Sequence, residues 1–381
     1  MSDTPRDPNS GAAGTEVQTA DALRTSGHEV DEVWETQLGR RIRHGNLHYL
    51  LELPRTYRRA LREAFAGAQY DVVHVNQPHG YLAAEWLARH HPGVPFVHRS
   101  HGLELRVERD LAPWRKLYAA GTQSPVRKEA SKLLAALLAR HTYRTVKAAW
   151  GHIVYVSEDR DFLVSELGVD DRRIAVIAAA APPFMTAAPA PPMSANRLRN
   201  IVYVSQFAFF KAPGIVAGAM NRLAARHSEL RFTWVCDAAH HEAVRALLDP
   251  ALRERIDLRS WIPQDQLRSI YDQAGIFLFP SFFEGFGKVF IEAMARGALV
   301  IATNVAGARD VIEDGVDGTL VRTGDVEAIV ERAEELLRNP RQAIAMSEAA
   351  AVKARTYTWT RAARESVEFY ERLKVLGPVH G

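Results

Sequence analysis

Short apolar runs alternate with helical patterns along almost the whole of this 381-residue chain. The runs are rich in Val, Ile and Phe and do not alternate cleanly with polar residues, which is typical of strands buried on both faces of a parallel sheet. The pattern therefore predicts an α/β fold. The helical patterns include Tyr57–Ala68, Ala83–His91, Leu267–Gln273 and Val326–Arg338. The expected strands are His28–Trp34, Asp71–Val75, Pro95–His98, His152–Val156, Ile174–Ile177, Ile201–Val204, Arg231–Val235, Ile256–Ser260, Gly275–Phe279, Ala298–Thr303 and Gly318–Val321.

A segment rich in proline and alanine, Ala178–Asn200, divides the chain nearly in half. It holds five prolines and shows no periodicity. Because proline lacks a backbone donor and favours extended chain, the segment is typical of a linker or hinge. We therefore expect two Rossmann-like domains whose parallel sheets face each other across a cleft. The expected boundaries are residues 1–180, a linker at 181–200, a second domain at 201–358 and a C-terminal helix within 359–381. Whether that helix packs on the second domain or crosses back to the first is left open by the sequence.

The composition is that of a globular protein, with 24% charged and 47% hydrophobic residues. Cys236 is the only cysteine, which excludes a disulfide framework. No apolar run has the length of a transmembrane helix, and the polar stretch Met1–Thr15 does not have the pattern of a signal peptide. A formal net charge of +3 does not indicate a nucleic-acid partner. We expect a cytoplasmic protein.

Basic residues are concentrated in two stretches of the N-terminal half. Residues 40–62 hold seven Arg and one acid, and residues 105–150 hold ten Lys or Arg and three acids. Such stretches are usually solvated helix faces, but they also suit the anionic surface of a membrane. We therefore expect weak, salt-sensitive contact with the inner face of a membrane.

The most informative stretch for chemistry runs from Phe279 to Gly297. A strand is expected to end near Pro280, and a helix to begin near Lys288, so the loop between them lies at the carboxyl end of a sheet, where α/β proteins bind ligands. The loop glycines allow close approach of a ligand, and the helix start suits a phosphate. Glu292 lies about one turn into that helix and can accept two hydrogen bonds from a ribose diol, while Glu284 on the loop can do the same for a hexose.

The spacing E-G-F-G-x-x-x-x-E, from Glu284 to Glu292, resembles the E-x7-E motif of the family-4 retaining glycosyltransferases, which have the GT-B fold. Other segments resemble the same family, and together they cover nearly the whole chain. They are Gly11–Gln18, Trp150–Asp159, Val202–Lys211 and Gly307–Asp314 followed by Gly315 and Gly318.

The resemblance implies a role for each matching residue. Glu284 would contact the donor sugar, Glu292 the nucleotide ribose, and Lys211 the donor diphosphate, which gains charge as it leaves. His101 would face the sugar from the acceptor side. Further donor contacts would come from Gly285, Phe286 and Gly287 through their backbone, from Gln206, and from the glycine loop Gly11–Gly14 near the phosphates. The family needs no cofactor and no metal, and none is expected here.

The function that this resemblance implies is transfer of a hexose from a nucleoside diphosphate sugar to a glycan, lipid or small-molecule acceptor, with retention of configuration. We expect front-face displacement, because no nucleophilic carboxylate suggests itself. A role in polysaccharide biosynthesis would fit. Two alternatives are a catalytically inactive GT-B protein that binds a nucleotide or a partner, and an epimerase or phosphorylase on the same fold.

Three departures from the family pattern favour a specialised or inactive member. Gln206 stands where the family has an Arg five residues before its Lys. Ala212 replaces a Gly, and Ala178–Ala180 replaces a Pro-Asn-Gly sequence before the linker.

Each candidate residue also has a purely structural interpretation. Glu284 and Glu292 could be a solvated loop acid and a surface helix acid, and Lys211 a surface lysine. His101 could simply hydrogen-bond the backbone at a strand end, and the segment Gly307–Gly318 could pack a helix on a strand. On the functional interpretation, Glu284→Gln should leave folding intact, because a loop carboxylate that reaches a ligand supports no core.

The first strand of the N-terminal domain is expected to be missing. A buried strand normally precedes the glycine loop of a Rossmann-like domain, yet only the polar residues Met1–Ser10, with two prolines, stand before Gly11. A start codon assigned too late would explain this, with Met1 at the end of the strand, and a genuine truncation is the alternative.

Overall fold

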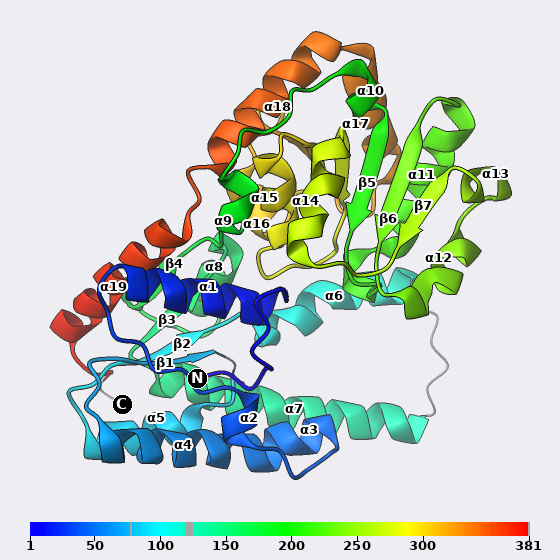
Figure 1. Ribbon diagram of the computed structural model, residues 1–381. Coiled ribbons are helices and arrows are strands. Elements are labelled where there is room, and N and C mark those ends of the chain that lie inside the picture. Colours follow the sequence, from blue (N-terminus) through cyan, green and yellow to red (C-terminus); the bar gives the residue numbers. More distant parts are fainter. Residues whose placement is uncertain (77, 119–124, 380–381) are drawn as a thin grey trace. The chain divides into compact units, whose positions relative to one another are not determined.

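The computed structural model describes residues 1–76, 78–118 and 125–379 of the chain (Figure 1). The chain forms two compact units. The first unit consists of Met1–Ala178 together with the C-terminal segment Trp359–Gly381, and the second unit consists of Ala179–Thr358. The proline-rich segment thus belongs to the second unit, where it contains two short helices, α9 (Pro183–Thr186) and α10 (Ala195–Leu198).

The first unit is built on a parallel sheet in the order β1-β2-β3-β4. Helices α1 (Ala12–Thr25) and α19 (Trp359–Leu376) lie on one face, and α4 (Leu53–Gly67), α5 (Tyr81–His90) and α7 (Pro125–Ala148) lie on the other (Figure 1). The helix α19 lies close against β3, because a Cβ added at Gly151 would stand 2.7 Å from side-chain atoms of Phe369 and Leu373. The four strands are Val73–Asn76, Phe96–Arg99, Gly151–Val154 and Ile174–Val176.

The strand expected at His28–Trp34 is wrong, since no strand is assigned there. Most of this segment is exposed or half-exposed, and it makes main-chain hydrogen bonds with the first residues of the chain. Ser2 N–H donates to Val33 O at 2.9 Å, and Glu35 N–H donates to Thr4 O at 3.3 Å. The first residues of the chain also contact β1, since the Met1 amino group donates to His74 O and Met1 O accepts from Asn76 N–H. Two isolated contacts do not make the continuous ladder that a strand requires.

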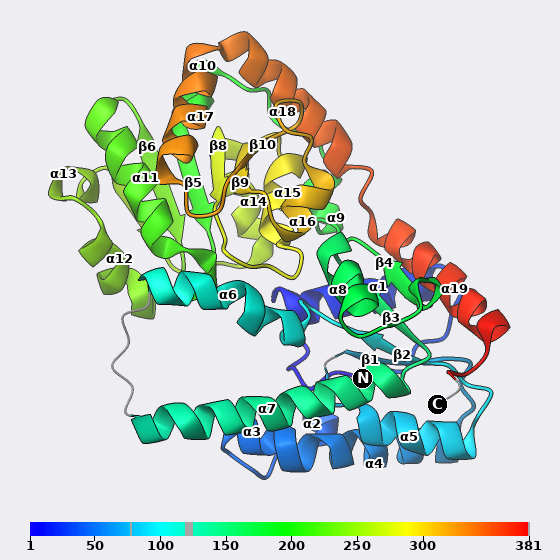
Figure 2. The same ribbon diagram turned by 180° about the vertical axis from the view of Figure 1, so that it is seen from behind.

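The remaining elements of the first unit are short or peripheral (Figure 2). They are α2 (Glu35–Leu38), α3 (Gly45–Leu47), the π-helix η1 (His48–Glu52), α6 (Glu104–Tyr118), α8 (Ser157–Ser165) and the 3-10 turn η2 (Asp171–Arg173).

No helix of the described residues is long and apolar enough to cross a membrane.

The second unit contains a six-stranded parallel sheet in the order β10-β9-β8-β5-β6-β7. Chain connections run outward in both directions from the neighbours β5 and β8, so the loops that follow these two strands emerge side by side. Such a topological switch point is where open α/β sheets bind their ligands. The strands are Asn200–Val204, Arg231–Val235, Ile256–Arg259, Ile276–Phe279, Leu299–Thr303 and Thr319–Val321, numbered β5 to β10.

Helices cover both faces of this sheet. Helices α11 (Pro213–Arg226) and α17 (Val326–Arg338) lie on one face, and α14 (Gln264–Gln273) and α15 (Lys288–Ala295) lie on the other (Figures 1 and 2). The expected α/β class with parallel sheets is confirmed in both units. The other elements are η3 (Phe209–Lys211), η4 (Ala238–His240), α12 (His241–Leu247), α13 (Pro250–Arg253), α16 (Ala306–Val311) and α18 (Pro340–Ala354).

Ala212, which precedes α11, has a left-handed backbone with φ of 54° and ψ of 51°. Side chains with a Cβ rarely adopt this conformation, and it costs them about 1–2 kcal/mol. Ala212 thus has a conformation that favours glycine, the residue that the family pattern has at this position.

We expect Ala212→Gly to leave the free energy of unfolding unchanged or to raise it by up to about 1 kcal/mol, because the relief of left-handed strain exceeds the added flexibility of the unfolded chain. Ala217, buried in the interior of α11, is the matched control. Ala217→Gly should destabilise by about 1 kcal/mol. Denaturant unfolding measures both, and equal losses in the two variants would contradict the strain at Ala212.

Candidate donor site and a histidine–carboxylate pair

Lys211 and Glu284 form a close ion pair between the loops that follow β5 and β8. The Lys211 Nζ atom lies 2.6 Å from Oε1 and 2.8 Å from Oε2 of Glu284. Ser281 Oγ also donates to Glu284 Oε1, at 2.7 Å. The side chains of Lys211 and Glu284 are only 15% and 5% exposed. Glu284 is therefore not a solvated loop acid, because its carboxylate is buried and joins the two loops through Lys211.

Hydrogen bonds between the loops fix the position of the pair. Phe282 N–H donates to Phe210 O at 2.8 Å, and the Tyr203 hydroxyl donates to Lys211 O at 2.9 Å. Thr303 Oγ1, at the end of β9, donates to Ser281 O at 2.6 Å. Because these contacts link three neighbouring strand ends, the pair stands on a rigid base at the switch point.

Two glycines allow the loop before α15 to take its shape. Gly287 has a φ of 92°, and a Cβ there would stand 2.3 Å from Phe279 Cζ. A Cβ at Gly307 would stand 2.4 Å from Phe286 O. Gly307 therefore lets α16 pack closely against the loop, so this glycine of the segment Gly307–Gly318 has a packing role. Phe286 itself is buried and lies against Phe290, with ring centroids 5.3 Å apart.

Glu292 lies on α15, as predicted, but it is buried rather than on the surface, with 2% of the residue exposed. The Tyr271 hydroxyl on α14 donates to Glu292 Oε2 at 3.0 Å. Burial raises the pKa of Glu292, and the charge of Lys288 and the hydrogen bond from Tyr271 oppose this shift. Burial also lowers the pKa of Lys288. The first two turns of α15 thus carry a half-buried ammonium, Lys288, and a buried carboxylate, Glu292.

The other residues expected at the donor site have different surroundings. Gln206 follows β5 and is exposed, and Gly285 is half-buried. Ser281 and Tyr271 were not predicted, because their contacts with the two glutamates arise only in the folded chain. Within the described residues, no group of three or more His, Cys, Asp or Glu is placed to hold a metal ion.

In the first unit, His101 pairs with Glu16, a residue that the sequence did not single out. His101 Nε2 lies 2.8 Å from Glu16 Oε1, and the Glu16 side chain is 4% exposed. A carboxylate partner favours the proton on Nε2, which leaves Nδ1 as a hydrogen-bond acceptor. Among the described residues, none hydrogen-bonds to the buried second oxygen of Glu16, Oε2. Glu16 is therefore a buried carboxylate whose hydrogen-bond partner is the partly exposed ring of His101.

The predicted glycine loop at Gly11–Gly14 is wrong in part. Helix α1 begins at Ala12, so Gly14 is buried within its first turn and only Gly11 lies before it. Neither glycine has a positive φ. This helix start places Glu16 in the second turn of α1, which brings its carboxylate to His101.

Both halves of the chain match known glycosyltransferase families. Residues 10–180 match the family described as Glycosyltransferase Family 4, and residues 199–339 match Glycosyl transferases group 1. A D-inositol 3-phosphate glycosyltransferase of Mycobacterium avium (strain 104) is 30% identical over 318 residues, which span 80% of this chain and 70% of that protein. The chain belongs to the family-4 glycosyltransferases. A D-inositol 3-phosphate glycosyltransferase of Rhodococcus opacus (strain B4) is 28% identical, over 80% of this chain and 68% of its own length.

Solved structures show that this family-4 glycosyltransferase has the GT-B fold. Sucrose-phosphate synthase from Thermosynechococcus elongatus matches with a TM-score of 0.73 and 18% identity, over 97% of this chain and 94% of that chain. HepE from Anabaena, solved in complex with UDP and glucose, matches with a TM-score of 0.66 and 15% identity, over 96% and 97%. At these identities the likeness concerns the fold alone.

Glu292→Gln tests the energetic consequence of the buried carboxylate. The raised pKa means that the folded protein holds this proton more tightly than the unfolded chain, so the contribution of Glu292 to stability falls as the pH rises through its pKa. Glutamine never ionises and still accepts from Tyr271. We expect the variant to be more stable than the parent near pH 8, with the difference shrinking toward about pH 4.

Thermal melting across this pH range measures the difference. The exposed Glu348 on α18 provides the control variant Glu348→Gln. A Glu292→Gln difference that does not change with pH would mean that burial of this charge does not strain the folded state.

Proposed function

We propose that this family-4 glycosyltransferase transfers a hexose from a nucleoside diphosphate sugar with retention of configuration. The observation that carries the proposal is the Lys211–Glu284 pair at the switch point of the second unit. An ammonium and a carboxylate in contact match the two chemically different parts of such a donor, its diphosphate and its hydroxylated ring. HepE from Anabaena, which shares the fold, has been solved in complex with UDP-glucose.

In this proposal the donor supplies new partners to both members of the pair. Phosphate oxygens accept from Lys211, and sugar hydroxyls donate to Glu284. As the bond between the anomeric carbon and the diphosphate oxygen breaks, negative charge grows on that oxygen, and the fixed ammonium stabilises it. The acceptor oxygen forms its bond on the same face, and its proton passes to the departing diphosphate. No metal or cofactor enters this scheme.

The rest of the donor is held by α15 and the loop before it. Main-chain N–H groups of Gly285, Phe286, Gly287 and the start of α15 suit the phosphates. The Glu292 carboxylate accepts from the ribose hydroxyls. In the first unit, His101 accepts from a substrate hydroxyl and is held in place by Glu16, and Gly11 and Gly14 lie at the start of the helix that carries Glu16.

The acceptor is proposed only as a hydroxyl-bearing glycan, lipid or small molecule. The relatives are named for D-inositol 3-phosphate, which therefore belongs in an acceptor panel. The second candidate function is a GT-B protein that binds a nucleotide without transferring sugar. Gln206 favours it, because an exposed neutral amide replaces a cation that would otherwise stabilise the leaving diphosphate.

We expect Glu284→Gln to lower transfer by about 100-fold or more, because the amide cannot accept sugar hydroxyls as a carboxylate does. Its melting temperature should fall modestly, because Lys211 loses its anion although Gln still accepts from Ser281. Lys211→Met should destabilise by up to about 3 kcal/mol, because it leaves Glu284 buried without its cation. The double variant should regain stability but not activity.

Sugar release from UDP-glucose and other nucleotide sugars, with and without acceptors, measures turnover, and melting curves measure stability. Full transfer by Glu284→Gln would refute its role. Tight nucleotide binding by the parent without any hydrolysis or transfer would favour the inactive binding protein.

We expect Gln206→Arg to preserve or raise kcat/KM for the donor, because an added cation near the diphosphate strengthens the stabilisation that Lys211 provides. The exposed position of Gln206 leaves room for the longer side chain. Gln206→Lys is a second variant with the same charge. A severe loss in both would show that the site is specialised for a neutral group at this position.

We also propose weak binding of the first unit to the inner, anionic face of a membrane. Helix α4 presents Arg55, Arg58, Arg59 and Arg62 to solvent. Near the two basic stretches, Leu117 on α6 and Leu133 on α7 are 70% and 66% exposed.

Substitution of Arg55, Arg58 and Arg62 by Gln should weaken vesicle binding by roughly 1 kcal/mol per residue. The readout is co-sedimentation with phosphatidylserine-containing vesicles at low and high salt. The control replaces three exposed arginines of the second unit, Arg332, Arg338 and Arg341, with the same change of charge. A parent protein that does not sediment with vesicles at low salt would end this proposal.

A further inference from the structure

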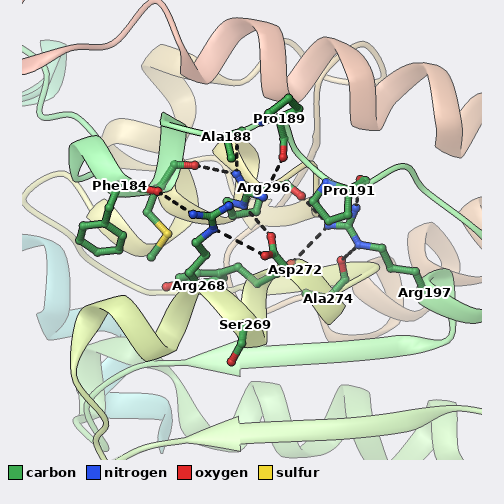
Figure 3. Close-up of polar contacts among 12 residues, drawn as sticks. Phe184, Ala188, Pro189, Pro191, Arg197, Arg268, Ser269, Asp272, Ala274 and Arg296 are labelled. Carbon is green, nitrogen blue, oxygen red and sulfur yellow. Dashed lines mark hydrogen bonds and ion pairs between the residues drawn. The ribbon is translucent and has the colours of Figure 1, made fainter.

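The proline-rich segment after Ala179 is bound tightly to the helices that carry the donor site. Arg296 is buried, with its side chain 2% exposed, at the end of α15. Its NH1 atom donates to Met185 O and Ala188 O, both at 2.8 Å, and its NH2 atom donates to Pro189 O at 2.9 Å (Figure 3). A segment with few backbone donors of its own thus has three of its carbonyls satisfied by one guanidinium.

A second buried arginine holds the other end of the segment. Arg197 NH1 donates to Pro191 O at 2.5 Å, and Arg197 Nε donates to Ala274 O at 2.9 Å (Figure 3). Its NH2 atom donates to Arg296 O and, at 3.3 Å, to Tyr271 O. The interpretation of this segment as a free linker or hinge is therefore wrong for residues 185–197, which belong to the packed second unit.

Arg296 also joins α15 to α14. Its Nε atom lies 2.6 Å from Asp272 Oδ1. Asp272 directly follows Tyr271, and Arg296 stands four residues after Glu292, one turn further along the same face of α15. The two helices are thus joined by two successive links, Tyr271–Glu292 at 3.0 Å and Asp272–Arg296 at 2.6 Å.

We propose that Arg296 is a positioning residue that sets the place of the Glu292 carboxylate for the donor ribose. The guanidinium is held on one side by the carbonyls of Met185, Ala188 and Pro189 and on the other by Asp272, and these contacts oppose rotation or sliding of α15 against α14. Since Glu292 is almost fully buried, a small displacement of its carboxylate removes it from the reach of a ligand hydroxyl. The inference deepens the proposed function, because it rests on the ribose role of Glu292.

The test measures discrimination between ribose and dideoxyribose. Calorimetry of the full chain gives the affinity for UDP, GDP and ADP, and for the 2′,3′-dideoxy form of whichever binds most tightly. Two hydrogen bonds to a carboxylate should favour the ribose form by at least about tenfold in the parent. Glu292→Gln should bring this ratio close to one, and Arg296→Met and Asp272→Asn should lower it at least threefold.

Arg255 provides the matched control within the same unit. Its guanidinium also donates to three main-chain carbonyls, those of Ala224, His227 and Leu230, at 2.6–2.9 Å, but it touches neither α14 nor α15 through them. Arg255→Met should lower the melting temperature as Arg296→Met does and leave the ribose ratio intact. A merely structural role for Arg296 predicts the same behaviour for both variants.

The outcomes separate the inference from the proposal on which it rests. If Glu292→Gln leaves the ratio unchanged, or no nucleoside diphosphate binds, the proposed ribose site is wrong and the inference falls with it. If Glu292→Gln abolishes the ratio but Arg296→Lys, Arg296→Met and Asp272→Asn all retain it, the positioning role is overturned. Should Arg296→Met not fold, Arg296→Lys and Asp272→Asn decide, since both keep a polar side chain at the substituted position. Equal loss in Glu292→Gln and in the double variant with Arg296→Met supports action through Glu292.

Discussion

The pairing of β5 with β8 is the constraint on which the candidate donor site depends. Ile201 and Val202 lie in register with Ile276 and Phe277, although the strands are separated by two β/α units in the sequence. This one crossover places the loop of Lys211 beside the loop of Glu284. Gly275 directly precedes β8, and Arg197 lies shortly before β5. The backbones of these two residues can approach each other closely because glycine has no Cβ, which at Gly275 would stand 2.2 Å from the carbonyl oxygen of Arg197.

Buried charged side chains hold together the loops and helices near the β5–β8 pair in the second unit. Glu284, Glu292 and Arg296 are each buried, and each has a partner of opposite charge or a hydrogen-bond donor that offsets its desolvation. Replacing any of them by an apolar residue would leave the partner unsatisfied, so ligand chemistry and folding are tied to the same side chains. This explains why Glu284 combines a proposed role toward the sugar with a role in joining two loops.

Local patterns were readable from the sequence, and contacts between distant residues were not. The start of α15 near Lys288 and the strands of both sheets depend on short-range propensity, so they could be predicted. The spacing of Glu284 and Glu292 is itself a local pattern in the sequence. The pair of His101 with Glu16 joins residues 85 positions apart, and no periodicity signals it. The packing of residues 185–197 could not be predicted from their composition. The prolines indicate only that the segment has few backbone N–H donors, whereas the donors that bind its carbonyls belong to Arg296, about 100 residues away in the sequence. His28–Trp34 has the composition of a strand but only scattered partners.

The three departures from the family pattern do not have equal weight. Ala212 keeps the left-handed backbone that glycine would adopt, so the path of the chain from Lys211 into α11 is preserved. Ala179 and Ala180 are almost fully buried, at 1% and 0% exposed, so the small side chains that replace the family's residues there are part of the packed core. Gln206 differs in kind, because it removes a charge without changing a backbone conformation or a core contact. On the function proposed above, the difference between an active transferase and a silent nucleotide-binding protein depends on whether Lys211 alone can stabilise a departing diphosphate.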